Sequence, residues 1–460
     1  MVRRGGDVEE EDDNEYAKLV RRMNPPRVVI DNDSCDNATV IRADRVKKHG
    51  ILLEAVQVLV DLNLVVTKAY ISSDGNWFMD VFNVTDQYGN KLEDQEVIDH
   101  IQRCLESEDC TVPPAIGPAG GVSPSAQLST CIELTGVDRP GLLSEVCAVL
   151  ASLSCNILRA DVWTHDKRAA AVIQIADEAT GLAAGGTARL SRAQELLRNV
   201  MHGDGERGRC AGEVSVGAAH AERRLHRLMT TMMMLDDGGA GHDVAGGEES
   251  SGKAKAKAKV VVMDCTERRY TVVIVRCRDR PKLLFDTLCA LSDLQYVVFH
   301  GTVDAEGGSN EAYQEYYIRH VDGHPVRSDA ERARLVRCLQ AAVERRVTAT
   351  DGLELEVRTE DRLGLLSEIT RVFRENSLSI VGAAISTKDG VAEDTFCVSD
   401  AYGNAVDGAT VESVRGQVGH AVLRVKRGGC ASGEPVEDGG AASILGTLLK
   451  GSFQLIRSYS

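Results

Sequence analysis

A short segment that occurs four times along the 460-residue chain is the feature that most constrains its fold. Each copy contains two adjacent aliphatic residues and ends in an acidic residue; the copies are His49–Glu54, Pro140–Glu145, Pro281–Asp286 and Leu363–Glu368. Asp-Arg precedes the last three copies, whereas Lys47-Lys48 precedes the first. Repetition of this kind indicates that one small supersecondary unit has been copied in tandem.

A second landmark keeps a fixed distance from the first. An aspartate lies 36 residues after the glycine in three copies, namely Asp86 after Gly50, Asp177 after Gly141 and Asp400 after Gly364. In the third copy Asp322 lies 40 residues after Lys282, and a longer turn at Gly307–Asn310 accounts for the difference. The constant spacing favours four copies of the same unit over four chance matches.

The pattern between these landmarks is typical of a βαββαβ unit. A strand precedes each copy, the first helix has an apolar side, a hairpin follows, and a short strand is expected to close each unit. Second helices are predicted at Glu96–Leu105, Leu190–Val200, Ala330–Val343 and Val411–Val422. The predicted fold class is therefore α+β, with four tandem ferredoxin-like βαββαβ units.

The units and their connections have predicted bounds. They are a disordered N-terminus at 1–25, unit one at 36–112, a linker at 113–126, unit two at 127–205, a flexible linker at 206–266, unit three at 267–346, unit four at 350–427 and a tail at 428–460 with a short amphipathic helix. Apolar spacing also predicts a short helix at Glu222–Met234. Because units of about 80 residues have small cores and exposed sheet edges, we expect them to pair side by side.

Composition narrows the range of partners and compartments. A formal net charge of -16 repels nucleic-acid phosphates and anionic lipid, and no apolar run is long enough to cross a membrane. The 13 cysteines are scattered without a CxxC pair, which favours reduced thiols and a cytoplasmic or nuclear location and predicts no metal site. The alternating lysines of Lys253–Lys259 fit either a nuclear-import signal or a solvated linker.

The loop between the first strand and first helix of each unit is the best candidate for chemistry. A helix start offers free amide groups and a positive dipole end, which suit an anion such as a carboxylate. In the second copy, Asp138 can cap the helix and Pro140 can begin it. The same residues also fit a purely structural helix start, and both interpretations remain open at this point.

The motif Asp138–Glu145 resembles that of the ACT domain, and the whole chain resembles the plant ACT-domain-repeat (ACR) proteins. Further similar stretches are Trp77–Asp86, Gln295–Gly301, Glu311–His320 and Phe453–Ser460, and the resemblance covers about 80% of the chain. The family is related to the C-terminal ACT region of bacterial uridylyltransferases. It implies regulatory modules that bind a free amino acid where two units meet, with the helix-start loop of one unit against the second strand of its neighbour.

Carried onto this chain, the resemblance predicts ligand-binding residues at three helix starts. They are Asp138, Arg139, Gly141, Leu142 and Leu143 in unit two, Asp361, Arg362, Gly364, Leu365 and Leu366 in unit four, and Gly50, Ile51 and Leu52 in unit one. Unit three departs from the pattern because Lys282 replaces the glycine, and unit one lacks Asp-Arg-Pro. A lysine at this position can block a ligand or instead contact a carboxylate.

No set of residues predicts an enzyme, a cofactor or a catalytic site. The His242-Asp243 pair lies in a glycine-rich segment, and neither His300 nor His320 has metal-ligand spacing to other residues. The leading interpretation is a non-enzymatic regulatory protein that binds amino acids and signals amino-acid status. The alternative is an ACT-repeat scaffold that associates with itself or with partner proteins and takes no small ligand; the sequence leaves the identity of the amino acid open.

Overall fold

The computed structural model describes residues 27–46, 50–74, 77–107, 130–181, 187–202, 211–216, 220–237, 258–265, 267–305, 311–350, 352–419 and 422–426. These residues form two eight-stranded sheets in which all neighbouring strands pair antiparallel. The predictions of a disordered N-terminus at 1–25, a linker at 113–126 and a helix-bearing tail at 428–460 fall outside the described residues.

Units two and four have the predicted order of elements. Unit two consists of β5 (Thr130–Val137), α4 (Leu142–Ser152), β6 (Cys155–His165), β7 (Arg168–Asp177), α5 (Thr187–His202) and β8 (Ala211–Val216). Unit four consists of β13 (Leu353–Glu360), α9 (Leu365–Glu375), β14 (Leu378–Lys388), β15 (Val391–Asp400), α10 (Gly408–Val418) and β16 (Leu423–Lys426). Both units place their second strand at one side and their last strand at the other, as the ferredoxin-like arrangement requires.

Units one and three reach the same arrangement with a different chain order. Unit one consists of β1 (Arg27–Asp31), β2 (Thr39–Val46), α2 (Ile51–Asp61), β3 (Val65–Asp74), β4 (Trp77–Thr85) and α3 (Gln95–Glu106). Unit three consists of β9 (Lys259–Cys265), β10 (Tyr270–Arg278), α7 (Leu283–Asp293), β11 (Tyr296–Asp304), β12 (Glu311–His320) and α8 (Asp329–Thr350). In both, the edge strand comes before the unit instead of after it.

The prediction that a last strand closes each unit is therefore wrong for units one and three. The edge positions beside β2 and β10 are taken by β1 and β9, which precede them in the chain. The predicted bounds of 36–112 and 267–346 consequently omit a strand that belongs to each sheet. An edge strand pairs along only one side, so it completes the sheet equally well from either end of the unit.

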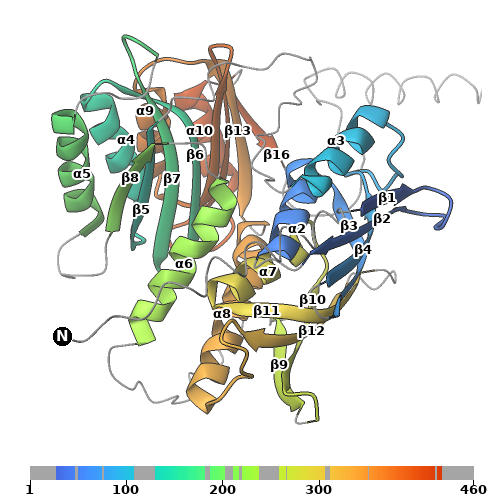
Figure 1. Cartoon of the computed structure of the whole chain (residues 1–460). Helices are drawn as coiled ribbons and strands as arrows, with labels where there is room; N and C mark the ends of the chain where they lie inside the picture. The colour runs from blue at the N-terminus through green and yellow to red at the C-terminus, as the bar shows by residue number, and fades with distance from the viewer. Residues whose placement is uncertain are drawn as a thin grey trace, which may run out of the picture.

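Side-by-side pairing is confirmed, and it joins alternate units instead of consecutive ones. Unit one pairs with unit three through β3 and β11, where Ile71 lies opposite Gly301. Unit two pairs with unit four through β6 and β14, where Val162 lies opposite Ala383. Each pairing merges two four-stranded sheets into one, and Figure 1 shows the two resulting sheets as separate blocks.

The first helix of every unit begins after a residue with a left-handed backbone. Gly141 has φ 84° and no side-chain capping bond, and α4 begins at Leu142. Asp138 is therefore not the cap, and Pro140 precedes the helix instead of beginning it. Glycine favours this conformation because it has no Cβ to clash. In unit three Lys282 adopts it with φ 64°, a strain of about 1 kcal/mol or more for an L-residue.

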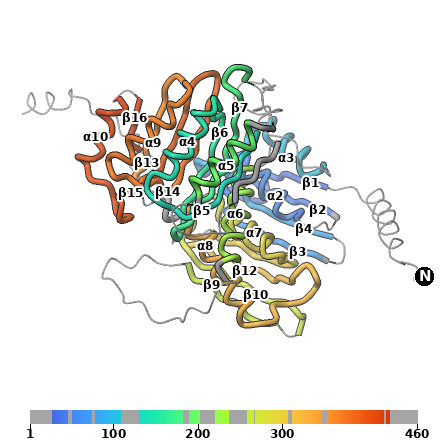
Figure 2. The backbone as a smooth tube through the Cα atoms, turned by 90° about the vertical axis from the view of Figure 1, so that its left-hand side faces the viewer, coloured from blue at the N-terminus to red at the C-terminus, as the bar shows by residue number. Residues whose placement is uncertain are grey.

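Helix α6 (Ala221–Asp237) lies between the two sheets, within the segment 206–266 predicted to be a flexible linker. The predicted amphipathic helix at Glu222–Met234 is confirmed. The prediction that all of 206–266 is a flexible linker is wrong, because β8, α6 and β9 lie within it and belong to the packed structure. Leu225 and Met229 pack on Ala170 and Val172 of β7. Figures 1 and 2 show α6 against one face of the second sheet, whose opposite face carries α4, α5, α9 and α10. A helix outside the repeated unit thus joins the two halves.

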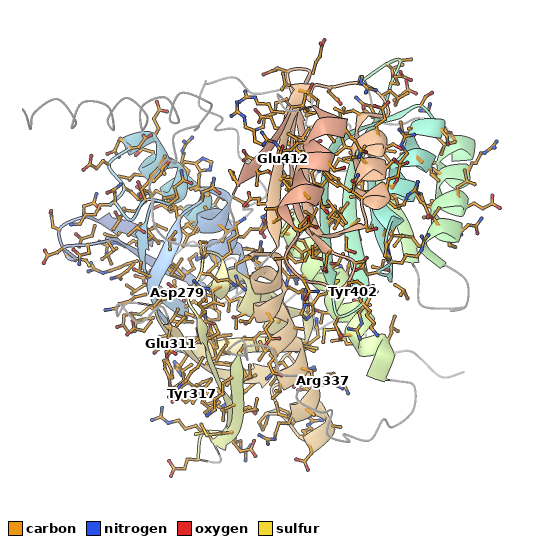
Figure 3. All side chains as sticks on the ribbon, turned by 180° about the vertical axis from the view of Figure 1, so that it is seen from behind. Asp279, Glu311, Tyr317, Arg337, Tyr402 and Glu412 are labelled. Carbon is orange, nitrogen blue, oxygen red and sulfur yellow. The ribbon has the colours of Figure 1, made fainter. Side chains whose placement is uncertain are left out.

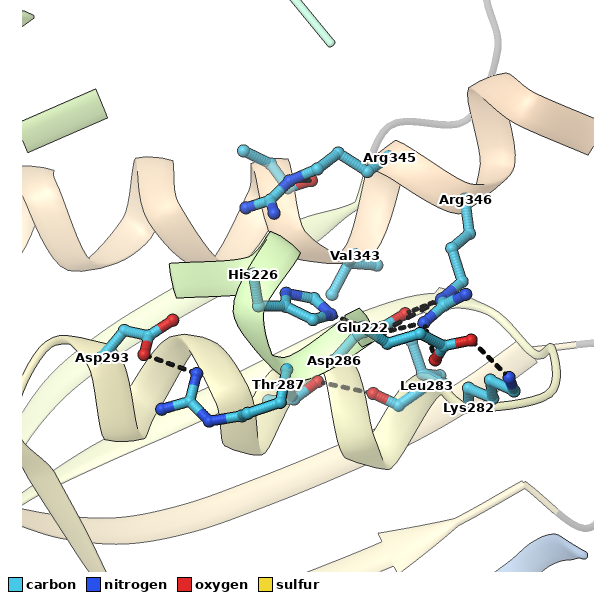
Figure 4. Close-up of polar contacts among 12 residues, drawn as sticks. Glu222, His226, Lys282, Leu283, Asp286, Thr287, Asp293, Val343, Arg345 and Arg346 are labelled. Atoms are coloured by element: carbon cyan, nitrogen blue, oxygen red, sulfur yellow. Dashed lines mark hydrogen bonds and ion pairs between the residues drawn. The ribbon is translucent and has the colours of Figure 1, made fainter. Parts of the chain in front are cut away.

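A buried network of charges fastens α6 to unit three (Figure 4). The carboxylate of Asp286, with a side-chain exposure of 0%, lies 2.7 Å from Nε2 of His226 on α6, 2.8 Å from Nε of Arg346 and 2.7 Å from Nη1 of Arg280. Burial alone would raise the pKa of Asp286, but the guanidinium groups of Arg346 and Arg280 and the hydrogen bond with His226 outweigh it and hold the pKa well below its usual range. Glu222 of α6 binds Nζ of Lys282 at 2.7 Å and Nη2 of Arg346 at 2.8 Å.

Replacing Asp286 tests how much the fold depends on this network. We expect Asp286→Asn to lower the free energy of unfolding by about 3 kcal/mol, because Arg280 loses its carboxylate partner and Arg346 keeps only Glu222. Glu368→Gln is the matched control, since Glu368 has the same position in unit four and pairs with Arg362 on the surface, with exposures of 52% and 56%. The control should lose less than about 1 kcal/mol. Chemical denaturation of both variants measures the difference, and equal losses would contradict the role given to the network.

Candidate functional site

Each pair of units forms two junctions that follow one plan. At a junction, the loop and first-helix start of one unit face the first helix and the start of the second strand of the paired unit. The unit-two loop faces Thr370, Arg374, Leu378, Ser379 and Ile380 of unit four, and the unit-four loop faces Cys147, Ala151, Cys155, Asn156 and Ile157 of unit two. The resemblance predicted this arrangement of a helix start against a neighbouring second strand.

The junction at the unit-two helix start holds a much larger cavity than the other three. Its volume is about 190 Å³, against about 30 Å³ at unit four, 20 Å³ at unit three and 40 Å³ at unit one. A cavity of about 20–40 Å³ holds only one or two water molecules. In this structure only the unit-two junction, among the four described, has room for an amino acid.

Small side chains on β7 explain why this junction is open. Ala171 lies opposite Leu134 in the ladder, and the residues in the same register of the other units are larger: Asp80 in unit one, Gln314 in unit three and Asp394 in unit four. The next inward position differs similarly, with Ile173 where the other units have Phe82, Tyr316 and Phe396. The space between β7 and α4 is therefore unfilled, whereas larger side chains fill the equivalent space in the other three units.

Two residues of opposite charge, Asp138 and Arg374, border this cavity. Asp138 follows β5, and its amide donates to the carbonyl of Lys167 at 2.9 Å. Burial raises the pKa of Asp138 to about 6, although a hydrogen bond from the amide of Arg139 opposes the shift. Arg374 projects from α9 of unit four, and a Cβ built on Gly141 would lie 2.5 Å from its Cδ atom. The cavity thus presents a carboxylate and a guanidinium toward the same space.

The predicted unit-two residues divide into two kinds. Gly141, Leu142 and Leu143 border the cavity and form the helix start, where the amide of Leu142 donates to the carbonyl of Arg139 at 3.1 Å. Arg139 also borders it, but its guanidinium donates to Oε1 of Glu145 at 2.8 Å and to the carbonyl of Val200 at 3.1 Å. The guanidinium of Arg139 therefore fastens the loop to α4 and α5.

The predicted unit-four residues come together around a space too small for an amino acid. Asp361, Arg362, Gly364, Leu365 and Leu366 all border the cavity of about 30 Å³. Asp361 accepts hydrogen bonds from Nδ2 of Asn156 at 3.3 Å and Oγ1 of Thr387 at 3.1 Å. Burial raises the pKa of the neighbouring Asp394 to about 7. At the unit-four junction, side chains of the protein fill most of the space that is empty at the unit-two junction.

The helix starts of units one and three are also closed. Gly50, Ile51 and Leu52 border a space of about 40 Å³ together with Phe78. In unit three the ammonium of Lys282 is bound to Glu222 of α6, so the lysine does contact a carboxylate, and the carboxylate belongs to the protein itself. Asp279, labelled in Figure 3, borders the unit-three space with Val65 and Val66 of β3.

Two residues that shape the unit-two junction were not predicted. Arg374 belongs to unit four, and the residues at its equivalent positions are Ala151, Val60 and Ser292, so no repeated motif marks it. Ala171 is part of the run Ala169-Ala170-Ala171. That run is a signal that sequence alignment of the four copies can detect, because bulky residues fill the same register elsewhere.

The described residues contain no group of three or more His, Cys, Asp or Glu side chains placed to hold a metal ion. Over the same ranges, no helix is long and apolar enough to cross a membrane. The unit-two cavity itself is bordered by the helix-start residues Gly141 and Leu142, the charged residues Asp138, Arg139 and Arg374, and an apolar wall.

Comparison with known proteins agrees with the motif and the fold. A model of the ACR family N-terminal ACT domain matches residues 34–112, and an ACT domain model matches residues 132–200. The ACT domain-containing protein ACR4 of Arabidopsis thaliana is 51% identical over 456 residues, which cover 97% of this chain and 98% of that protein. ACR6 of the same plant is 54% identical over 416 residues, 90% of this chain and 92% of that protein.

A more distant similarity reaches a bacterial enzyme. A bifunctional uridylyltransferase/uridylyl-removing enzyme of Azospirillum brasilense is 35% identical over 81 residues, which cover 18% of this chain and 9% of that enzyme. The match spans about the length of one repeated unit. The near full-length similarity to the plant proteins confirms that this chain belongs to the ACR family of ACT-domain-repeat proteins.

Proposed function

We propose that the protein is a non-enzymatic regulatory protein that binds a free amino acid at the junction of units two and four and signals amino-acid status. The observation that carries the proposal is the cavity of about 190 Å³ at the unit-two helix start. It lies where the resemblance predicts a ligand, and no other described junction has comparable space. Binding would stiffen the contact between units two and four and shift a partner-binding equilibrium.

The charges that border the cavity support a zwitterionic ligand. An α-carboxylate can accept from the first-turn amides of α4 and from Arg374, while an α-ammonium can donate to Asp138. Every cysteine in the described ranges is a free thiol, which fits the cytoplasmic or nuclear location that we propose with this function.

A scaffold without a small ligand is the second candidate function. It is favoured by the three closed junctions and by two large apolar side chains of the first sheet that are exposed within the described residues, Tyr70 at 52% and Met79 at 59%. Tyr317, labelled in Figure 3, lies on the same sheet. Exposed apolar residues of this kind fit association with another protein surface.

Calorimetry of the full-length chain against the common amino acids, with two matched glycine variants, separates these candidates. Gly141→Ala should abolish or strongly weaken binding, because the new Cβ displaces Arg374. Gly364→Ala is the control, since its φ of 81° is equally strained but its Cβ has nothing within 4 Å. Both variants should lose about 1–2 kcal/mol of stability through the same backbone strain. Absence of heat with every amino acid for the folded wild-type protein would favour the scaffold.

Replacing Asp138 should separate binding from stability. The folded-state pKa of about 6 lies above the ordinary 3.8, so ionised Asp138 destabilises the fold as pH rises through 4 to 6. We therefore expect Asp138→Asn to raise the free energy of unfolding at pH 7 by up to about 2 kcal/mol and to weaken amino-acid binding. Wild-type affinity should fall about tenfold between pH 7 and pH 5 as the carboxylate is protonated. Thermal melts and calorimetry measure these effects, and a destabilised variant with unchanged affinity would contradict them.

A further inference from the structure

We propose that the unit-two cavity selects one aliphatic amino acid of the size range from valine to methionine, with its α-carboxylate held by Arg374 of unit four. This inference rests on the proposed function and adds the class of ligand, the anchoring residue and a stoichiometry of one per chain.

Volume sets the size of the ligand. A cavity of about 150 Å³ with aliphatic and aromatic walls accommodates benzene, which corresponds to about 25 Å³ per non-hydrogen atom. The volume of about 190 Å³ therefore holds about eight non-hydrogen atoms, the size of valine. The charged head of the ligand can project toward Asp138 and Arg374, so leucine, isoleucine and methionine also fit. Tyrosine and tryptophan exceed the space.

The chemistry of the wall sets the side chain of the ligand. Apart from the charged residues Asp138, Arg139 and Arg374, the described lining residues are apolar or carry only a hydroxyl; the apolar ones include Leu134, Leu143, Val146, Val162, Met201 and Ile380. An ionised or amide side chain entering the wall region would lose water without gaining a matching partner. Aspartate, glutamate, glutamine, lysine and arginine are therefore excluded.

Arg374 sets the orientation of the ligand. It lies beside the α4 helix start. Within the described residues its guanidinium makes no direct ion pair, although its charge helps to lower the pKa of Glu145 on α4. Two positive features, the guanidinium and the first-turn amides, therefore meet where a carboxylate would lie. Asp138, which also borders the cavity, suits the ammonium, which leaves the side chain directed toward Ala171.

A single ligand per chain follows from the packing of the other junctions. Where unit two has Ala171, the other units have Asp80, Gln314 or Asp394, and where unit four contributes Arg374, the other junctions have an alanine, a valine or a serine. Both features that make the site occur together at only this one of the four described junctions.

Titration of the full-length protein by calorimetry tests the ligand class and stoichiometry. Valine, leucine, isoleucine and methionine should bind with one site per chain, and glutamine, glutamate, lysine and tryptophan should bind at least tenfold more weakly. No heat with any amino acid would overturn the proposed function itself. Tighter binding of a charged, amide or large aromatic amino acid, or two or more sites, would leave the proposed function standing and overturn this inference.

Two substitutions on β7 test the role of the cavity. Ala171→Gln introduces the side chain that unit three has at this register, and Ala171→Leu fills the space with apolar atoms. Both should reduce leucine affinity at least tenfold, and Ala171→Leu should keep or raise the melting temperature because it fills a void in a folded core. Unchanged leucine affinity in a folded Ala171→Leu protein would overturn the placement of the side chain.

Arg374→Ala, with Arg371→Ala as the control on the same helix, tests the anchor. Leucine affinity should fall about tenfold for Arg374→Ala and stay unchanged for Arg371→Ala. Leucinamide, which lacks the carboxylate, is the probe that isolates the contact. Its affinity should be equally weak for the wild type and for Arg374→Ala. An equal loss for leucine and leucinamide would show that Arg374 only shapes the junction, and it would overturn the proposed anchor.

Discussion

Antiparallel hydrogen bonding between the second strands of paired units is the interaction on which every junction depends. The β6–β14 ladder aligns the helix start of unit two with α9 and β14 of unit four, and β3–β11 does the same for units one and three. Without these ladders the first-turn amides would face water, where electrostatic attraction to a carboxylate is weak. Edge pairing therefore stabilises small units and, at the same time, creates the partly enclosed space in which recognition is possible.

Much of the fold could be predicted from the sequence because it is encoded locally. The repeated helix start, the 36-residue spacing and the apolar periodicity predict four units and their helices. The pairing of alternate units could not be predicted, since any second strand can hydrogen-bond to any other through its backbone. The positions of β1 and β9 were missed because an edge strand has no required place in chain order. The packed role of α6 depends on Ala170 and Val172, which lie far away in the sequence.

The candidate site, like the fold, has features that the local sequence predicts and features that depend on distant residues. The glycine and the aliphatic pair at each helix start were predicted, because their backbone geometry follows from local sequence. The sequence did not predict which of the four copies has an open cavity. That depends on the side-chain volumes along β7 and on Arg374, which comes from another unit. The four copies share a backbone and differ in side chains at only a few registers. The four copies thus share the backbone of the site, and in three of them side chains of the protein fill the space where a ligand would lie.

The alternate pairing of units also changes what a break in the chain would do. Units one and two precede α6 and units three and four follow it, so each sheet draws strands from both sides of that helix. A cut after α6 would leave two fragments, neither of which contains all the strands of either sheet. One fragment would display β3 and β6 as bare edges and the other β11 and β14, each matching the edge it lost. The two fragments would therefore rebuild the molecule by complementation, whereas a chain with consecutive units paired would separate into two self-contained halves.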